Sequence, residues 1–314
     1  DVESGNPVAV KMLPKRLEGD SGMVARFELE AKAGLLLNHP NIVRTYEYQQ
    51  TEGVYGDVFY VVMEIVEGLS LEELIVRNGP LPWPAACDTI RQAAAGLQHA
   101  HNHGTIHRDI KPANLLIDTT GHVKIADFGL SKIESEAEDE FSLQMIFGHD
   151  CLGTADYIAP EQTLDSNAID GRADIYSLGC TFYATLTGKL PFPLKSTKQK
   201  LEAQRTRKPR PVTSLVEDLP AEVPAILEKM ISKRPETRFQ EAQDICLALS
   251  PFSERCRPEF SFDKVLIQRA QIARKKIAAK QAHRTGGSSV VLGHSGTAQS
   301  AIETSIRERK KPDE

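Results

Sequence analysis

Long apolar runs are absent from this chain of 314 residues. Its most apolar stretches, residues 59–63 and the interrupted stretch 175–186, fall short of the roughly 20 apolar residues that span a bilayer. No segment has the charged, apolar and small-residue order of a signal peptide. We therefore expect no membrane span in this chain and a cytoplasmic location, unless a longer parent chain tethers it to a membrane.

Cysteine is scarce, and its spacing is irregular. The five cysteines are odd in number and lack the paired spacing of a zinc site or a disulfide framework: Cys87, Cys151, Cys180, Cys246 and Cys256. This pattern argues against a disulfide-stabilised secreted domain and indicates a reducing compartment. The remaining composition, with 40% apolar and 26% charged residues, is that of an ordinary soluble globular protein.

The chain does contain a run of polar residues suited to phosphoryl transfer. Residues 107–114 read HRDIKPAN, and DFG follows at residues 127–129. The transition state of phosphoryl transfer spreads negative charge over oxygen atoms, and metal ions and cations neutralise that charge. The spacing of these residue types resembles that of protein kinases. Chance would produce such a set in a chain of this length about once in 10⁴.

This resemblance implies a role for each polar residue of the two motifs. Asp109 would orient the acceptor hydroxyl and accept its proton, while Lys111 would stabilise the transferred phosphate. Asn114 and Asp127 would hold Mg²⁺ ions, because hard oxygen ligands suit this small cation. ATP and Mg²⁺ are thus the expected cofactors, and proteins with serine or threonine hydroxyls are the expected substrates.

Landmarks of a nucleotide site precede these motifs in the order of the family. Residues 8–11 alternate as a strand, which would direct Lys11 at the phosphates. Glu30 would lie on the next helix and pair with Lys11. Ser21 is the expected N-cap of that helix. Its apolar face is expected to consist of Phe27, Ala31, Leu35 and Leu37.

Residues 58–65 predict a buried strand that runs into a hinge. By the same resemblance, Met63 would be the gatekeeper beside the nucleotide, and backbone groups of Glu64 and Val66 would contact adenine. The apolar residues expected to close the adenine slot from above and below are Ala9 and Leu116.

The segment between DFG and the Ala-Pro-Glu sequence that ends at Glu161 resembles an activation segment. Thr154 would lie where a substrate docks, and with Lys111 it favours serine/threonine over tyrosine specificity. Asp150 would mimic a phosphorylated threonine by pairing with Arg108. A solvated loop carboxylate is the equal alternative for Asp150. Two serines are other candidate phosphorylation sites: Ser135 and Ser142.

Two further residues are expected to have structural roles. Asp174 lies in an otherwise apolar helix and would hold the backbone of the catalytic loop, because a buried carboxylate without such hydrogen bonds would be costly. By resemblance, Arg238 would pair with Glu161.

Together these motifs imply an α+β fold of the protein-kinase-like, two-lobe type. A small β-rich lobe with one helix would precede a larger and mainly helical lobe. We expect a partial small lobe at residues 1–66, the large lobe at 67–252 and a C-terminal tail at 253–314. One helix of the large lobe would bury Ala86, Ile90, Ala93, Leu97 and Ala100.

The tail is basic from residue 262 onward, with a net charge of +6 against −11 for the rest of the chain. Apolar residues at positions 266, 270, 273 and 277 suit an amphipathic helix that contacts the acidic body, an anionic surface or a partner. A solvated linker is the favoured alternative, because Gly-Gly-Ser-Ser follows at 286–289. With Phe262 as its only aromatic residue, the tail is not expected to bind nucleic acid.

Two departures from the family pattern stand out. No G-x-G-x-x-G sequence occurs, so the loop that covers the phosphates is missing, and we expect the chain to be a fragment because it also lacks an initiating methionine. Gly34 stands where relatives carry a bulky apolar residue. This predicts a packing gap that a partner, Leu35 or Leu37 would fill.

The sequence therefore predicts a serine/threonine protein kinase catalytic domain, weakly active or inactive without the phosphate-covering loop. Dimerisation and autophosphorylation are further expectations for its partners. The alternative is a pseudokinase-type nucleotide-binding scaffold, which the intact Lys11, Asp109, Asn114 and Asp127 disfavour.

Overall fold

The structure is a computed structural model, and the residues it describes are 5–13, 20–53, 56–128, 155–164, 169–271 and 274. It divides into one compact unit, Asp1–Phe260, and a second, Ser261–Glu314. Several positions of interest lie outside the described residues: Ser135, Ser142, Asp150, Cys151 and Thr154. The proposed phosphate mimic and phosphorylation sites therefore stay predictions.

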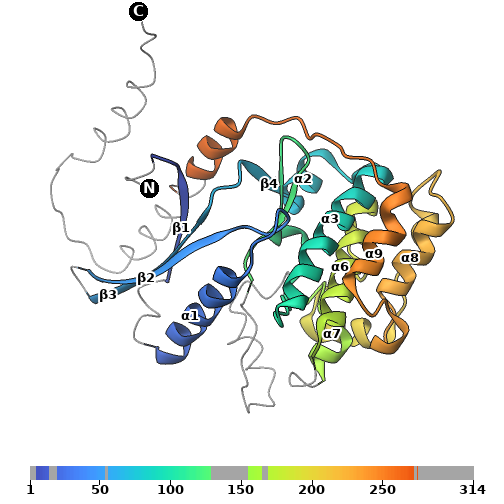
Figure 1. The fold of residues 1–314 in the computed structure, drawn as a ribbon. Coiled ribbons are helices and arrows are strands. Elements are labelled where there is room, and N and C mark those ends of the chain that lie inside the picture. The colour runs from blue at the N-terminus through green and yellow to red at the C-terminus, as the bar shows by residue number, and fades with distance from the viewer. Residues whose placement is uncertain are drawn as a thin grey trace, which may run out of the picture. The chain divides into compact units, whose positions relative to one another are not determined.

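The N-terminal part of the first unit is an antiparallel sheet with one helix (Figure 1). Strands β1 (Val8–Met12), β2 (Thr45–Gly53) and β3 (Gly56–Glu64) form the sheet in the order β1-β3-β2. Helix α1 (Ser21–Leu36) packs beside β2. A core between helix and sheet consists of Leu13, Phe27, Ala31, Phe59 and Val61.

Helix α1 differs from its prediction at both ends. Its N-cap is Asp20, not Ser21, and the Asp20 carboxylate accepts hydrogen bonds from the N–H groups of Gly22 and Met23 at 3.0 and 3.2 Å. Leu35, expected on the buried face, is 43% exposed. Leu37 is buried as expected, but it follows the last turn of the helix.

The larger part of the first unit is mainly helical. A small antiparallel sheet of β4 (Gly68–Ser70), β5 (Leu115–Asp118) and β6 (Val123–Ile125) lies at its start. The α-helices are α2 (Leu71–Asn78), α3 (Trp83–Asn102), α6 (Gly171–Thr187), α7 (Thr197–Thr206), α8 (Glu222–Met230) and α9 (Ala242–Leu249). Short 3-10 helices are η2 (Pro112–Asn114), η4 (Pro160–Thr163), η5 (Val212–Ser214), η6 (Pro235–Thr237) and η7 (Ser250–Phe252).

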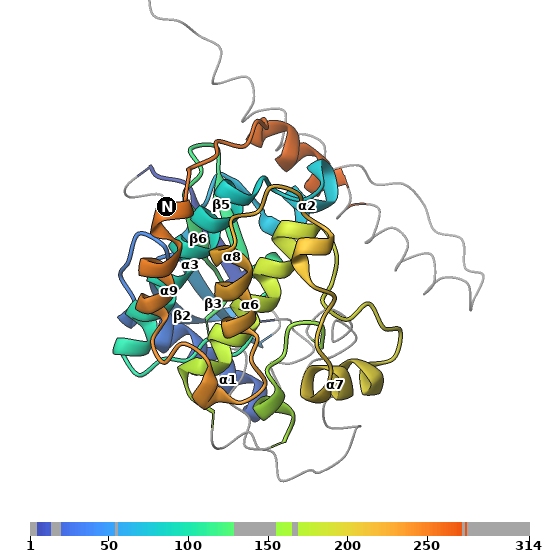
Figure 2. The same ribbon diagram turned by 90° about the vertical axis from the view of Figure 1, so that its right-hand side faces the viewer.

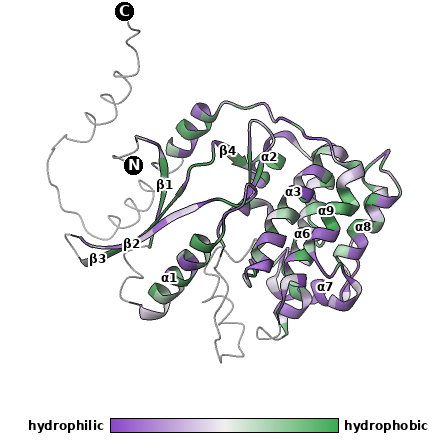
Figure 3. Ribbon diagram, in the orientation of Figure 1, coloured by the Kyte–Doolittle hydropathy of each residue, from purple (hydrophilic) through white to green (hydrophobic). Residues whose placement is uncertain are grey.

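Two helices form the centre of this part (Figure 2). Helix α3 packs against α6 and α9, and its predicted apolar face, from Ala86 to Ala100, is fully buried. Helix α6 is buried along nearly its whole length. Figure 3 shows hydrophobic and hydrophilic residues together along α1 and α3, as expected for helices with one face against a core.

In the second unit, residues 262–271 are helical. Across the described parts of the chain, no helix has both the length and the apolar character needed to cross a membrane.

Three histidines stack between the loop after α1 and the end of α3. The rings of His39 and His99 lie 5.1 Å apart, and those of His99 and His103 lie 4.4 Å apart. His39 Nδ1 accepts a hydrogen bond of 3.1 Å from the N–H of Asn41, so this nitrogen carries no proton. Burial lowers the pKa of His39 and of His99, and the neighbouring histidines and Lys124 lower it further.

The stack predicts a loss of stability in acid. A histidine whose folded pKa is lowered stays neutral in the native state, so the unfolded chain takes up protons first as the pH falls below about 6.5. The free energy of unfolding should therefore fall between pH 7.5 and pH 5.5, and H39Q should reduce the size of this fall. Urea denaturation at both pH values measures it, with H122Q as a control outside the stack. An equal fall in wild type and H39Q would contradict the prediction.

Candidate active site

The catalytic loop is anchored by a carboxylate from α6. Asp174 is completely buried, and its two oxygens accept hydrogen bonds from the N–H groups of His107 and Arg108 at 2.8 and 2.6 Å. His101 on α3 contacts the same carboxylate at 2.8 Å. Burial opposes the charged form, but the hydrogen bonds from His101 and the loop hold the pKa of Asp174 below its usual value.

The loop gathers three predicted catalytic residues around one buried carboxylate. The Asp109 carboxylate forms an ion pair with Lys111 Nζ at 2.8 Å. Asn114 Nδ2 donates hydrogen bonds to the Asp109 carboxylate at 3.2 Å and to the Asp109 backbone carbonyl at 2.8 Å. The His107 ring supports this arrangement from beneath: Nε2 lies 2.9 Å from the carbonyl of Ala126, and Nδ1 accepts the Asp109 N–H at 3.3 Å. Asp109 is thus held in one orientation.

Lys11 links the β1-β3-β2 sheet to Asp127, which lies two residues after β6. Its ammonium group lies 2.6 Å from Glu30 on α1 and 2.8 Å from Asp127. Burial alone would lower the pKa of Lys11, but the two carboxylates raise it above its usual value. Burial raises the pKa of Glu30. Partial desolvation also opposes the charged form of Asp127, but the ammonium group of Lys11 holds the pKa of Asp127 below its usual value.

A small cavity of about 30 Å³ lies behind this ion pair. Lys11, Glu30, Asp127 and the predicted gatekeeper Met63 all line it. Of the two predicted metal-binding residues, Asp127 lines this cavity and Asn114 does not. The Asp127 side chain is 40% exposed. A carboxylate that is charged and accessible fits a hard cation, which Asn114 on the neighbouring η2 could also approach.

Gly34 also lines this cavity, and the residue that packs against it differs from the two leucines that were predicted. A Cβ atom on Gly34 would lie 2.4 Å from Thr45 Oγ1, so the first residue of β2 already occupies the space. Neither Leu35 nor Leu37 fills it. The glycine is therefore required by a close contact between α1 and β2.

The predicted adenine slot is distributed over three strands. Ala9 on β1 pairs in register with Met63 on β3, and Leu116 lies on β5. Glu64 is held in place by its N–H, which donates to the Arg44 carbonyl at 2.8 Å, and by its carboxylate, which pairs with Lys124 at 3.0 Å. The Val66 carbonyl accepts a hydrogen bond from Gly68. The adenine contacts of these residues stay predictions.

Arg108 and Asp127 both have left-handed backbone, with φ of 63° and 59°. Such angles are uncommon for residues other than glycine and are held only where surrounding contacts enforce them. For Arg108 these contacts are the Asp174 carboxylate on its N–H and the Gln162 side-chain amide, which donates to its carbonyl at 2.9 Å.

The end of the activation segment is fixed by an arginine. Arg238 makes a bidentate ion pair with Glu161, at 2.6 and 2.8 Å, and also donates to the carbonyls of Arg172, Ser232 and Lys233. Its guanidinium group lies 4.8 Å from the centre of the Tyr176 ring. A fully buried arginine with this many acceptors is compatible with a structural role.

One buried contact near the same segment was not predicted. Lys200 on α7 pairs with Asp156 at 2.7 Å, and both side chains are buried. Gln204 Nε2 donates to the Asp156 carbonyl at 2.7 Å. Lysine and aspartate 44 residues apart give no periodic signal, so sequence reasoning had no means of pairing them.

The comparisons with known proteins agree on one family. The family model described as protein kinase domain matches residues 1–248. Serine/threonine-protein kinase PknB of Mycobacterium leprae (strain TN) is 35% identical over 246 residues, which are 78% of this chain and 38% of that protein. Serine/threonine-protein kinase PknL of Mycobacterium tuberculosis (strain CDC 1551 / Oshkosh) is 36% identical over 265 residues, 83% of this chain and 63% of that protein.

A solved structure has the same fold. It is the crystal structure of a mutant of the Mycobacterium tuberculosis PknI kinase domain, with a TM-score of 0.57 and 23% identity. The match covers 78% of this chain and 84% of that one. It confirms the predicted α+β, two-lobe fold, with its small β-rich and larger helical parts.

Removal of the Asp174 carboxylate should be among the most damaging single changes. In D174A two buried backbone N–H groups lose their acceptor, and each hydrogen bond to a charged group contributes about 1.5–3 kcal/mol. We expect a loss of roughly 3 kcal/mol or more in the free energy of unfolding, measured by urea denaturation. D244A removes an exposed aspartate from α9 as a control. A loss in D174A no larger than in D244A would contradict the anchor.

Alanine at position 34 tests the contact with Thr45. G34A should gain up to about 1 kcal/mol of helix propensity, yet the clash with Thr45 should make the protein about 1–2 kcal/mol less stable. In a T45A background the clash is relieved, so the same substitution should be neutral or stabilising. Thermal or urea unfolding of the four proteins in this double-mutant cycle measures the coupling. Equal effects of G34A in both backgrounds would show that the contact does not matter.

Proposed function

The chain belongs to the protein kinase domain family, and we propose that it transfers the γ-phosphate of ATP to serine or threonine hydroxyls of proteins. It spans 38% of the length of the PknB protein it matches, so activity and substrates are inferred from the site. The observation that carries the proposal is the convergence of Lys11, Glu30 and Asp127 beside the loop that holds Asp109.

Asp109 is the proposed catalytic base. Its carboxylate would accept the proton of the substrate hydroxyl as that oxygen bonds to phosphorus. Lys111, 2.8 Å from Asp109, would move between this carboxylate and the transferred phosphate and so stabilise the developing negative charge. Asn114 holds the Asp109 backbone and side chain and thus orients the base.

Lys11 is the proposed phosphate-binding residue of the small lobe. Glu30 holds its ammonium group in place, as the 2.6 Å contact indicates. The second contact, with Asp127, would be exchanged for nucleotide phosphate and metal when they bind, since a carboxylate cannot serve both fully. Met63, Glu64, Val66, Ala9 and Leu116 would form the adenine slot.

Asp127 and Asn114 are the proposed Mg²⁺ ligands. The described residues contain no cluster of three histidine, cysteine or acidic side chains that could hold a metal by itself. Two protein ligands fit Mg²⁺, which usually keeps several water molecules and binds through substrate phosphates as well. The bound ions would neutralise charge on the phosphates.

The type of substrate follows from Lys111 and Thr154, which favour serine or threonine. The names of the PknB and PknL relatives support the same specificity. We further propose a cytoplasmic location, because ATP and the free cysteines suit a reducing compartment. Autophosphorylation and dimerisation remain part of this proposal, as does pairing of Arg108 with Asp150.

Transfer of radiolabelled phosphate tests the proposal. The longest natural form of the protein is incubated with γ-labelled ATP, Mg²⁺ and a basic protein rich in serine and threonine. D109N should lower the rate by about 10² to 10⁴, because general-base catalysis typically contributes that much. K11M should abolish ATP-dependent labelling, whereas K208M, which removes an exposed lysine outside the site, should not.

The same assay separates the alternative function. A pseudokinase-type scaffold would show an ATP-dependent rise in melting temperature without any transfer of phosphate to itself or to the basic protein. That outcome, or full activity of D109N, would overturn the proposed catalytic role.

A further inference from the structure

A second cavity, larger than the one that Lys11 lines, lies away from the candidate active site. It has a volume of about 390 Å³, against about 30 Å³ for the cavity behind Lys11, and the two share no lining residue. Ligand sites are typically 300–1,000 Å³ in volume, mostly apolar, with a few polar groups that fix orientation. The larger cavity meets this description.

One wall of the cavity is the connection between α2 and α3. Helix α2 ends at Asn78, and Gly79 follows with a φ of 82° that turns the chain. Two prolines then flank Leu81, whose N–H donates to the Thr185 carbonyl of α6 at 3.0 Å. Prolines and this hydrogen bond restrict the backbone, so the wall is preformed.

The opposite wall is the segment of residues 256–259, which follows η7. The N–H of Glu254 donates to the Pro84 carbonyl at 3.1 Å and ties this segment to the start of α3. Gly121, with a φ of 80°, permits the close approach, because a Cβ there would lie 2.2 Å from the Cys256 carbonyl oxygen. A glycine is thus needed for the segment to lie where it closes the cavity.

The floor is aliphatic. Leu74 of α2, Leu81 of the connection and Ile117 of β5 line it, and no aromatic ring is present among the lining residues. Such a surface favours a flexible alkyl chain over a planar ring system, because stacking partners are lacking. Removing each methylene of a bound alkyl chain should weaken binding by about two- to fourfold.

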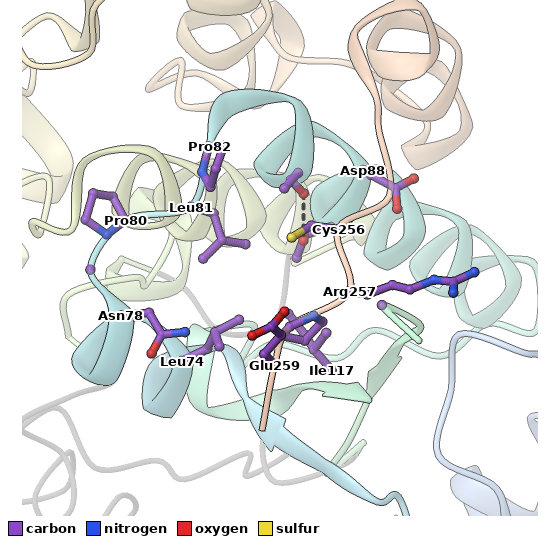
Figure 4. A pocket seen from close by; sticks show the side chains of 15 residues that line it. Leu74, Asn78, Pro80, Leu81, Pro82, Asp88, Ile117, Cys256, Arg257 and Glu259 are labelled. Carbon is purple, nitrogen blue, oxygen red and sulfur yellow. Dashed lines mark hydrogen bonds between the residues drawn. The ribbon is translucent and has the colours of Figure 1, made fainter. Parts of the chain in front are cut away.

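The charged residues at the cavity indicate the charge of the ligand's polar head group. Asp88 is also at the edge, but its carboxylate is already bound by Arg91 at 2.5 Å and Gln92 at 2.8 Å. Figure 4 shows the Glu259 carboxylate over the apolar floor near Leu74 and Ile117, whereas Arg257 extends away from that floor. Among the described residues, Glu259 has no ion pair. It is therefore the charged group best placed to receive a cation.

We propose that this cavity is a second ligand site, which binds a small amphipathic cation. An aliphatic chain lies against Leu74, Leu81 and Ile117, and an ammonium-type head contacts Glu259, with Asn78 as a further hydrogen-bonding group at the edge. The site is separate from nucleotide binding and does not depend on the proposed kinase activity.

Three alkyl probes of the same length test the chemistry. Calorimetric titration of the protein with n-octylammonium, n-octanoate and octan-1-ol compares a cationic, an anionic and a neutral head on one chain. The ammonium should bind saturably and at least fivefold more tightly than octanoate, and n-hexylammonium should bind about tenfold more weakly than n-octylammonium. Equal or tighter binding of octanoate, or no saturable binding of the ammonium, would overturn the proposal.

Two glutamates five residues apart, Glu254 and Glu259, provide matched variants. E259Q should weaken octylammonium binding about five- to tenfold and reduce it to the level of octan-1-ol, while E254Q, which changes another exposed glutamate that does not line the cavity, should not. Both changes are at the surface and should leave folding and phosphate transfer unchanged. Equal effects of the two variants would contradict the role of Glu259.

Cys256 reports where the probe binds. It lines the cavity and is exposed, whereas Cys87, Cys180 and Cys246 are buried, and burial raises their pKa values to about 12, 12 and 11. Octylammonium should therefore slow the alkylation of Cys256 by N-ethylmaleimide at least threefold, as followed by peptide mass spectrometry. Unchanged alkylation, or displacement of the probe by ADP and Mg²⁺, would place the ligand elsewhere and overturn the proposal.

Discussion

The catalytic loop depends on one buried negative charge. The loop between α3 and η2 contains no helix or strand, so it lacks the regular backbone hydrogen bonds that would hold it in place. Asp174 supplies what is lacking, because its carboxylate receives two consecutive backbone N–H groups and the ring of His101. A charge at this depth is stable only with such partners. Helix α6 therefore stabilises the fold and positions Asp109 at the same time.

A second constraint acts between the β1-β3-β2 sheet and the rest of the first unit. Lys11 is fixed by its place on β1, and Glu30 by its place on α1, whereas Asp127 follows β6. Their contacts at 2.6 and 2.8 Å mean that β1, α1 and the segment after β6 must be correctly placed together. Loss of any one of these placements would separate Lys11, the proposed phosphate-binding residue, from Asp127, the proposed metal ligand. The position of Lys11 in the site therefore depends on the packing of all three parts of the chain.

The fold could be predicted from the sequence because strands and helices show a regular spacing of apolar residues, and because the motifs between them lie at fixed distances along the chain. The strand expected at residues 8–11 is β1, and all five predicted buried positions of α3 have no exposed surface. The N-cap of α1 was wrong because Asp20 and Ser21 are both good caps, and only backbone angles distinguish them. The predicted neighbours of Gly34 were wrong because the residue that packs against it, Thr45, comes from a different element. The cavity beside α2 left no sequence signal, since its walls are separated by about 180 residues.

The left-handed backbone of Arg108 and Asp127 limits how far the catalytic segment can be transplanted. Each such residue costs on the order of 1–2 kcal/mol relative to a relaxed conformation. A peptide of residues 107–114, or the same residues grafted onto another scaffold, would lack the carboxylate and the amide that hold Arg108 in this geometry. An engineered phosphotransferase would therefore have to import part of α6 and Gln162 along with the motif.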